Sequence, residues 1–357
     1  MKHTQALNLR QLPSVLPSIP PPVQRRKKTG SLDTLAQLGT ELENPLILSP
    51  LTDVRNGSAL VKRARAKYMT RAVVVRLASL DSPLSKAYWN SFHCCSTLVK
   101  TGDKIAGKYC KNRWCLVCNR IRTARLIQSY QPVLSSWPDK HFLTLTVPNV
   151  KAGALPAEIE RMQGTLKTIL EMFKKQYQRN GYLKIIGVRK FECTYNPIRN
   201  DFHPHFHIIV DSLGAASCIQ AEWLRRFPDC SSKAQDIRPA LDKDCLELFK
   251  YFTKIITKSK NDNSTLPINP QALDTIMQAI TGVRTFQPFG FKLPEAAEQA
   301  APVDEASVET VLDEIAYQWY QDFHDWISPD GDCLSGYTAS AAMQELIEQM
   351  EGAKNEN

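Results

Sequence analysis

The sequence lacks several features that mark other classes of protein. No uninterrupted apolar run approaches the ~18 residues that a membrane-spanning helix needs. The N-terminal region has no compact apolar core before a small-residue cleavage site, and a proline run (20–22) precedes a basic cluster (25–28), so we expect no secretory signal. With 357 residues, 43% of them hydrophobic, the chain is too long for a disulfide-stapled miniprotein and can hold about two domains. We expect a soluble, cytoplasmic protein with no membrane partner.

Acidic residues are scarce over most of the chain, and basic residues are scarce at its C-terminal end. Residues 293–357 hold 15 Asp or Glu and one basic residue, whereas residues 1–292 hold 44 Lys or Arg and 21 Asp or Glu, a net charge of +23. A body this basic suits a polyanion such as nucleic acid, although a basic excess also serves ordinary solubility. Residues 1–85 are expected to be largely flexible, and residues 305–327 are expected to be helical.

Ten cysteines without an export signal indicate free thiols or metal ligands rather than disulfides. Three of them follow a C-x4-C-x2-C pattern: Cys110, Cys115 and Cys118. This spacing is typical of a structural zinc site, which needs four ligands. We expect Cys95 to be the fourth ligand, with Cys94 or His93 as alternatives.

Basic residues surround these cysteines, with Tyr109 and Trp114 between them. Such a mixture suits phosphate contacts and the stacking of single-stranded bases. The predicted DNA-binding residues are Lys108, Lys111, Arg113, Arg120, Arg122 and Arg125.

From residue 141 to about 292 the pattern alternates between strand and helix. FLTLTV (142–147) has the alternation of a strand, and Pro156 begins an amphipathic helix that reaches about Asn180. KIIGVRKFECTY (184–195) and HPHFHIIV (203–210) form a predicted hairpin, followed by a helix capped by Ser212, the strand AQDIRPAL (234–241) and a helix containing Tyr251. This βαββαβ order predicts an α+β fold with a ferredoxin-like antiparallel sheet and helices on one face.

Three histidines alternate along the second hairpin strand: His203, His205 and His207. Their side chains share one face of the strand, and a hairpin that turns at residues 198–199 places Glu192 opposite His205. Two imidazoles and a carboxylate make a site for a divalent ion, with magnesium or manganese favoured over zinc. His203 is the weakest candidate of the three. The alternative is that the histidines only decorate a solvent-facing surface.

In LELFKYFTKIITK (246–258), helical spacing places four polar residues on one face: Glu247, Tyr251, Lys254 and Lys258. A tyrosine phenol is a weak nucleophile at neutral pH and needs a polarised phosphate, a base or a nearby cation. Lys254 could supply the cation, and Glu247 could accept a proton. A tyrosine on an amphipathic helix is by itself usually a boundary residue, so this hypothesis depends on the histidine strand.

Together, FLTLTVPN, HPHFHIIV and ExxxYxxK resemble in order and spacing the three motifs of HUH endonucleases, in which U is a bulky hydrophobic residue. The resemblance covers roughly residues 88–292 and is closest to rolling-circle plasmid replication initiators. It implies a metal-dependent enzyme that nicks and rejoins one strand of plasmid or phage origin DNA, single-stranded or in a hairpin, through a 5′-phosphotyrosine.

The resemblance also implies roles for individual residues. His205 and His207 match the metal-binding pair, with Glu192 as third ligand, and Tyr251 matches the nucleophile. Glu247 matches the acidic residue that helps a water molecule cleave the DNA at termination. A single tyrosine in the motif fits the one-tyrosine branch better than the two-tyrosine variants.

Two other functions stay open. A single-tyrosine transposase or a relaxase uses the same chemistry, but such transposases are usually shorter and relaxases usually place the tyrosine before the histidines. A non-catalytic zinc-dependent DNA-binding regulator would not need Tyr251. We predict four regions: a basic segment (1–85), a cysteine-rich segment that precedes or is inserted in the nuclease (86–137), a catalytic domain (138–292) and an acidic tail (293–357). The tail could contact a host helicase or polymerase, mimic DNA, or add solubility.

Overall fold

A computed structural model of the chain describes residues 58–102, 104–249, 256–258, 265–267, 269–293 and 314–352. The chain divides into two units, Met1–Asn44 and Pro45–Asn357, and every described residue belongs to the second. Among the described residues, no helix is both long and apolar enough to cross a membrane.

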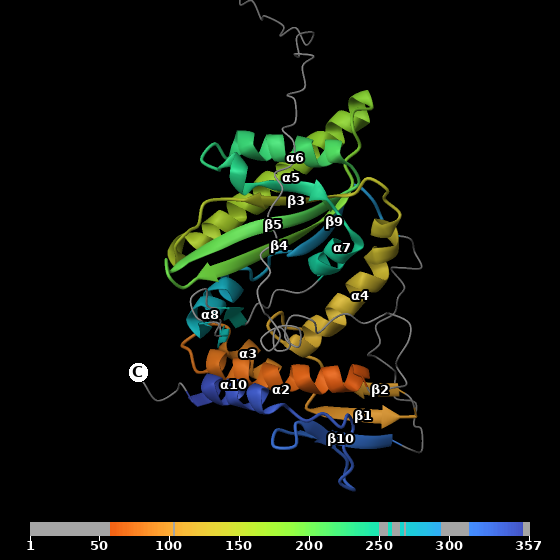
Figure 1. Cartoon of the computed structure of the whole chain (residues 1–357), viewed down its shortest axis with the longest axis vertical. Coiled ribbons are helices and arrows are strands. Elements are labelled where there is room, and N and C mark those ends of the chain that lie inside the picture. Colours follow the sequence, from red (N-terminus) through yellow and green to blue (C-terminus); the bar gives the residue numbers. More distant parts are fainter. Residues whose placement is uncertain are drawn as a thin grey trace, which may run out of the picture. The chain divides into compact units, whose positions relative to one another are not determined.

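The larger part of the described chain is built on a five-stranded antiparallel sheet with the order β6-β3-β5-β4-β9 (Figure 1). Its strands are β3 (His141–Thr146), β4 (Gly187–Asn196), β5 (Asp201–Val210), β6 (Asp236–Pro239) and β9 (Phe286–Phe289). Helices α5 (Leu155–Asn180) and α6 (Leu213–Arg226) cover one face (Figure 1). The order β3-α5-β4-β5-α6-β6 confirms the predicted βαββαβ arrangement.

Local sequence explains why these elements form. Pro156 lies in the first turn of α5, where a missing N–H costs nothing, and Gly181 ends the helix at φ +63°. The buried residues of α5 recur at spacings of three and four: Leu155, Ile159, Met162, Leu166, Ile169 and Phe173. At the start of α6, the Ser212 Oγ accepts a hydrogen bond from the Ala215 N–H at 3.3 Å, as the predicted cap requires.

The opposite face of the sheet carries α4 (Leu116–Ser135) and α7 (Asp242–Phe249). Tyr130 and Leu134 of α4, with Leu248 and Phe249 of α7, join a buried apolar cluster with sheet residues such as Ile209. Side chains alternate along a strand, so this face of β4 and β5 also presents Glu192, His205 and His207. The apolar cluster thus covers one end of a face whose other end is polar.

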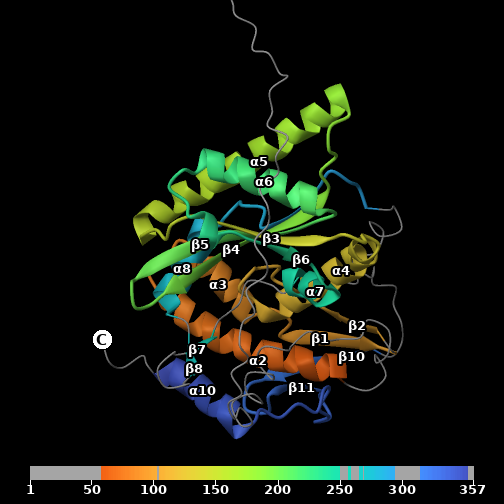
Figure 2. The ribbon, with the colours of Figure 1, turned by 45° about the horizontal axis from the view of Figure 1, so that its top comes forward.

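A second antiparallel sheet has the order β11-β10-β1-β2. It joins β1 (Thr97–Thr101) and β2 (Lys104–Gly107) to β10 (Glu314–Tyr320) and β11 (Asp325–Ile327). Helices α2 (Ser58–Ala78), α3 (Ser85–Phe92) and α10 (Ala341–Gly352) accompany it, with α10 beside α2 (Figure 2). The remaining elements are α8 (Pro270–Ala279), the short strands β7 (Ile256–Lys258) and β8 (Thr265–Pro267), and the 3₁₀ turns Ala152–Ala154 and Ser232–Ala234.

Three sequence-based predictions need correction. Residues 58–78 form a helix rather than a flexible segment, because Ala64, Tyr68 and Leu77 give it a buried side. The predicted helix over 305–327 is wrong for 314–320 and 325–327, which are strands; residues 305–313 lie outside the described residues. Tyr317 and Trp319 are buried while the residues between and beside them are exposed, which is the period of a strand paired with β1.

The third correction concerns the tyrosine helix. It is described only to Phe249, and residues 256–258 pair with β8 as a strand, so the predicted helical face does not extend to Lys258. The four predicted domain boundaries stay a prediction.

Trp223 tests the packing between α6 and the sheet. Its side chain is fully buried, and 4.2 Å separates the centre of its ring from that of Phe227. Its Nε1–H donates to the Thr146 carbonyl at 3.1 Å. We expect Trp223→Ala to lower the free energy of unfolding by ~3–5 kcal/mol, because it leaves a cavity. Urea titration followed by circular dichroism measures this loss. Leu213→Ala, at the exposed start of the same helix, is the control and should change the value by less than ~0.5 kcal/mol.

Candidate metal centres

Glu192, His205 and His207 converge on the polar end of the sheet face. The hairpin pairs Glu192 with His205, as the sequence predicted, and Lys190 with His207. The Glu192 Oε2 atom lies 3.6 Å from the Nε2 atoms of both histidines. Ligand atoms bonded to one ion at ~2.1 Å are ~3–3.6 Å from one another, so this trio could hold a single divalent ion.

The outer nitrogens of both imidazoles have partners that orient the rings. The His205 Nδ1 lies 3.0 Å from the His203 carbonyl oxygen. A carbonyl can only accept, so Nδ1 carries the hydrogen, and Nε2 is the ring nitrogen that faces Glu192. The His207 Nδ1 lies 3.3 Å from the Thr144 Oγ1, on the neighbouring strand β3. Such outer contacts hold metal-binding histidines in the correct tautomer and orientation.

Lys190 is a buried cation beside the trio. Its Nζ forms an ion pair with Glu192 Oε1, which leaves Oε2 for the histidines. Burial alone would raise the pKa of the Glu192 carboxyl, but the charge of Lys190 and the contacts with His205 and His207 outweigh burial and hold this pKa well below its usual range. The carboxylate is therefore ionised and ready to bind a cation.

His203 stays outside the trio. Its Nδ1 lies 2.9 Å from the Asn149 Oδ1, and the Asn149 amide donates in turn to Asp201 at 2.7 Å. Burial, then the neighbouring charges of His205 and Arg199, lower the pKa of His203 to about 4. Its ring stacks on that of His205, with 5.1 Å between the ring centres. His203 therefore supports the site rather than completing it.

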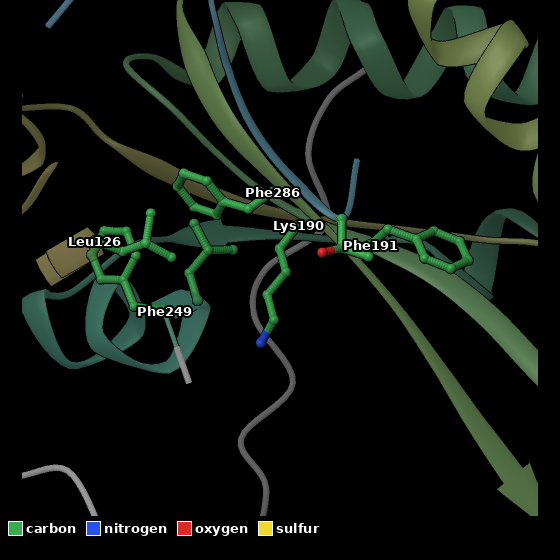
Figure 3. Close-up of a pocket in the computed structure, with 7 residues that line it drawn as sticks. Leu126, Lys190, Phe191, Phe249 and Phe286 are labelled. Atoms are coloured by element: carbon green, nitrogen blue, oxygen red, sulfur yellow. The ribbon is translucent and has the colours of Figure 1, made fainter. Parts of the chain in front are cut away.

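A small pocket lies between Lys190 and the end of α7 (Figure 3). Its lining comes from four parts of the chain: Leu126, Lys190, Phe191, Leu248, Phe249, Thr285 and Phe286. The Thr123 Oγ1 of α4 donates to the Phe249 carbonyl at 3.1 Å and so fixes the end of α7 at this pocket. Of Glu247 only the backbone is described, and Tyr251 and Lys254 lie outside the described residues.

Four cysteine sulfurs form a second group: Cys94, Cys110, Cys115 and Cys118. The Cys118 Sγ lies 3.5 Å from that of Cys94 and 3.6 Å from that of Cys110. Sulfurs that bind one zinc tetrahedrally at ~2.3 Å are ~3.8 Å apart, so the group could hold a metal ion. The backbone N–H groups of Cys110 and Lys111 donate to the sulfurs of Cys94 and Cys118, an arrangement that suits thiolates.

The expectation that Cys95 completes this group is wrong, because Cys94 takes that place. The chain turns sharply here, with φ +46° at Cys95, whose N–H donates to the Lys108 carbonyl. The buried Lys67 ammonium donates to the Cys94 carbonyl at 2.7 Å, and the Trp326 Nε1–H donates to the Cys95 carbonyl at 2.7 Å. Contacts from distant segments thus hold these two adjacent residues in different positions, and only the Cys94 sulfur joins the group. The other alternative, His93, is exposed and outside the group.

The predicted DNA-binding residues differ in their surroundings. Lys108, Lys111 and Arg125 are exposed. Arg113 donates to the carbonyls of Ile280 and Val283. Arg122 donates to Asn119 and to the Lys111 carbonyl. Both arginines therefore also stabilise the fold. Arg120 is mostly buried, and burial followed by the charges of Arg63 and Arg65 lowers its pKa to about 10.

Sequence reasoning missed two residues beside the trio. Lys190 precedes Glu192 by two positions on a strand, so the alternation rule already placed it on the same face. Thr144 is the first of the two polar residues of FLTLTV, but its contact with His207 depends on which strand lies beside β5. Lys67, under the cysteine group, had no signal in the sequence beyond a basic run.

Comparisons with known proteins find similar replication proteins. The family described as "Replication protein" matches residues 103–212. A "Protein rep" from Staphylococcus aureus is 33% identical over 176 residues, which cover 43% of this chain and 74% of that protein. Proteins of the same description from Streptococcus pneumoniae and a Bacillus species are 26% and 29% identical, and the chain spans about half of their lengths, 55% and 52%. No solved structure is a significant match.

Three observations lead to one assignment. The sheet has the βαββαβ order, a histidine pair faces a glutamate, and a third of the residues are shared with a Rep protein over most of that protein's length. The chain belongs to the replication protein (Rep) family of rolling-circle plasmid initiators, within the HUH-endonuclease superfamily.

Proposed function

We propose that the protein initiates rolling-circle replication of a plasmid by nicking and rejoining one strand of origin DNA through a 5′-phosphotyrosine. The observation that carries this proposal is the convergence of Glu192, His205 and His207 beside the end of α7, in a chain of the Rep family. The proposal includes origin DNA as substrate, a cytoplasmic location, and a host helicase and polymerase as partners.

The nitrogen and oxygen ligands of the trio suit magnesium or manganese, which when bound would polarise the scissile phosphate. The Tyr251 phenol oxygen then attacks the phosphorus atom. The new bond joins this oxygen to the phosphorus at the 5′ end of the DNA, and the bond between phosphorus and the 3′ oxygen breaks. The phenol loses its proton and the leaving 3′ oxygen gains one, which frees a 3′-hydroxyl to prime synthesis. Lys254 reduces the cost of charge on the phenol oxygen, and Glu247 takes the proton of the water that ends the reaction.

Lys190 supports this chemistry through Glu192. Its ion pair keeps the partly buried carboxylate ionised and leaves Oε2 toward the histidines. We propose a second ion, zinc, in the cysteine group, where four sulfurs close the coordination shell and leave no position for substrate. That ion is structural and holds the turn after α3 against the start of α4.

Replacing the nucleophile is the first test. We expect Tyr251→Phe to abolish the denaturation-resistant DNA adduct while leaving DNA binding intact, because only the phenol oxygen is removed. Labelled single-stranded DNA carrying candidate origin hairpins, incubated with manganese or EDTA and run on a denaturing gel, shows the adduct. Tyr182→Phe, at an exposed position after α5, is the matched control and should keep it. Tight DNA binding with no adduct from the unaltered protein would support the non-catalytic regulator.

Histidine variants separate the metal trio from its neighbour. His205→Gln and His207→Gln each remove a ligand and should lower both manganese affinity and adduct yield by ~100-fold or more. His203→Gln keeps the backbone carbonyl that orients His205 and should change either quantity by less than ~10-fold. Manganese binding is measured by calorimetry without DNA. Equal losses of manganese affinity in all three variants would contradict the assignment of His205 and His207, without His203, as the histidine ligands.

A cysteine pair tests the second ion. Purified protein should contain about one zinc per chain, measured by atomic emission. Cys94→Ser should lose this zinc, because a sulfur of the group is gone, whereas Cys95→Ser should keep it. Circular dichroism of both variants provides the control for folding. Zinc retained in Cys94→Ser and lost from a folded Cys95→Ser would reverse the assignment.

A further inference from the structure

The turn of the β4–β5 hairpin, residues 197–200, carries the most exposed large apolar side chain among the described residues. Ile198 is 88% exposed, and the next in this order, Phe323, is 63% exposed. Figure 1 shows the turn at the end of the five-stranded sheet that lies away from α4 and α7. A single exposed apolar residue is common on protein surfaces, so its surroundings decide whether it has a role.

Hydrogen bonds hold the turn in one conformation. The Asn196 Oδ1 accepts from the backbone N–H groups of Ile198 and Arg199 at 3.0 and 3.2 Å. From a separate segment, the Lys151 ammonium donates to the Arg199 and Asn200 carbonyls at 2.6 and 3.2 Å. The backbone is thus fixed from within the turn and from outside it. Because little further ordering is needed, binding through this turn costs little conformational entropy.

Positive charge surrounds Ile198. The Arg199 side chain is 60% exposed and forms an ion pair with Asp201 at 3.0 Å. Lys151 binds carbonyl oxygens, which carry no net charge and leave its own charge in place. Two cations and one carboxylate therefore leave a positive charge beside the apolar tip. This combination suits duplex DNA, in which charged phosphates surround a stack of bases.

A chain of hydrogen bonds connects the turn to the metal trio. Asp201, the partner of Arg199, accepts from the Asn149 amide at 2.7 Å. The Asn149 Oδ1 lies 2.9 Å from the His203 Nδ1. The His203 carbonyl accepts in turn from the His205 Nδ1 at 3.0 Å. The turn and one histidine of the trio therefore belong to one hydrogen-bonded unit, with a fixed spacing between them.

The hairpin also sets how far the turn lies from the trio. From Glu192 to Asn196, strand β4 advances by ~13 Å, and the turn lies beyond that point. Duplex DNA advances by ~3.4 Å per step, so the turn is at least ~4 steps from a phosphate at the trio. Helix α7 packs in the opposite direction, with Val188 and Ile209. DNA that contacts both α7 and the turn therefore crosses the trio.

We propose that Ile198 inserts between stacked base pairs of the origin DNA, next to the strand held at the trio, while Arg199 contacts a neighbouring phosphate. Isoleucine is among the apolar residues that act as wedges in DNA complexes, where they unstack a base step and bend the duplex. Unstacking at this distance frees a short single strand for the trio. The identity of the DNA rests on the proposed function, but the wedge itself does not require nicking.

Unstacking is measured with 2-aminopurine, an adenine analogue whose fluorescence rises when it leaves the base stack. A DNA stem-loop with this base at each stem position in turn is titrated with protein, without added magnesium or manganese. We expect a rise at a few adjacent positions, ~4–6 steps from the nick. Ile198→Ser should abolish the rise, and Ile198→Leu should keep it, because leucine is also a wedge residue. Leu213→Ser, exposed at the start of α6, is the matched control and should keep it.

A second measurement isolates Arg199. Arg199→Gln should lower the slope of log affinity against log salt by ~0.9 on a DNA duplex, which is roughly a fivefold loss of affinity at ~0.15 M salt. Arg199→Lys keeps the charge and should restore the slope. Arg225→Gln is the matched control, because Arg225 is 63% exposed and ion-paired with Glu222 on α6, and the slope should not change. Fluorescence anisotropy gives the affinities, and an unchanged urea midpoint shows that the variants fold.

These readouts separate the wedge from the proposed function. A rise that survives in Ile198→Ser, or no rise at any position with the unaltered protein, overturns the wedge whether or not the protein nicks DNA. Loss of the rise in Leu213→Ser or Ile198→Leu also overturns it. A rise that depends on Ile198 in a protein that never forms an adduct supports the wedge and contradicts the nicking function. If neither DNA readout changes, the turn does not contact DNA, and a protein partner is the better occupant.

Discussion

The register of the β4–β5 hairpin is the constraint on which the candidate active site depends. A slip of one residue would turn a strand's side chains to the opposite face and separate Glu192 from the histidines. Packing prevents this slip, because Phe191 and Phe206 contact each other under α6, with 5.4 Å between their ring centres. The buried aromatic residues on one face thus hold the polar residues on the other face in place, although none of them takes part in the chemistry.

The same sheet face also holds the opposite charges of Glu192 and Lys190, which offset each other. A partly buried carboxylate is unfavourable alone, and Lys190 offsets that cost from the next position on the same side of β4. Apolar residues of α4 and α7 cover the neighbouring end of the face and limit the access of water there. The ionised Glu192 carboxylate therefore lies at the border of an apolar cluster, a setting in which a bound cation and a phosphate interact strongly.

Local patterns predicted the five-stranded sheet well. Alternation identified β3, β4 and β5, and a hairpin with a short turn leaves few possible registers, so the pairing of Glu192 with His205 followed from counting. The choice between Cys94 and Cys95 could not follow in this way, because the Cys95 carbonyl is held by Trp326, 231 residues away. For the same reason β10 was predicted as helix: its strand partner, β1, lies more than 200 residues earlier in the chain.

The pairing of β1 with β10 also sets an order of events during synthesis. All strands of the five-stranded sheet have been made once residue 289 leaves the ribosome, but Thr97 pairs with Gln318, which is translated much later. At ~5–20 residues per second the cysteine-rich segment waits on the order of ten seconds or more for its partner strand. A chain interrupted before residue 314 would have all strands of the five-stranded sheet and only half of those of the four-stranded sheet. Vectorial folding of this protein therefore completes the candidate catalytic sheet before the cysteine-bearing module that adjoins it.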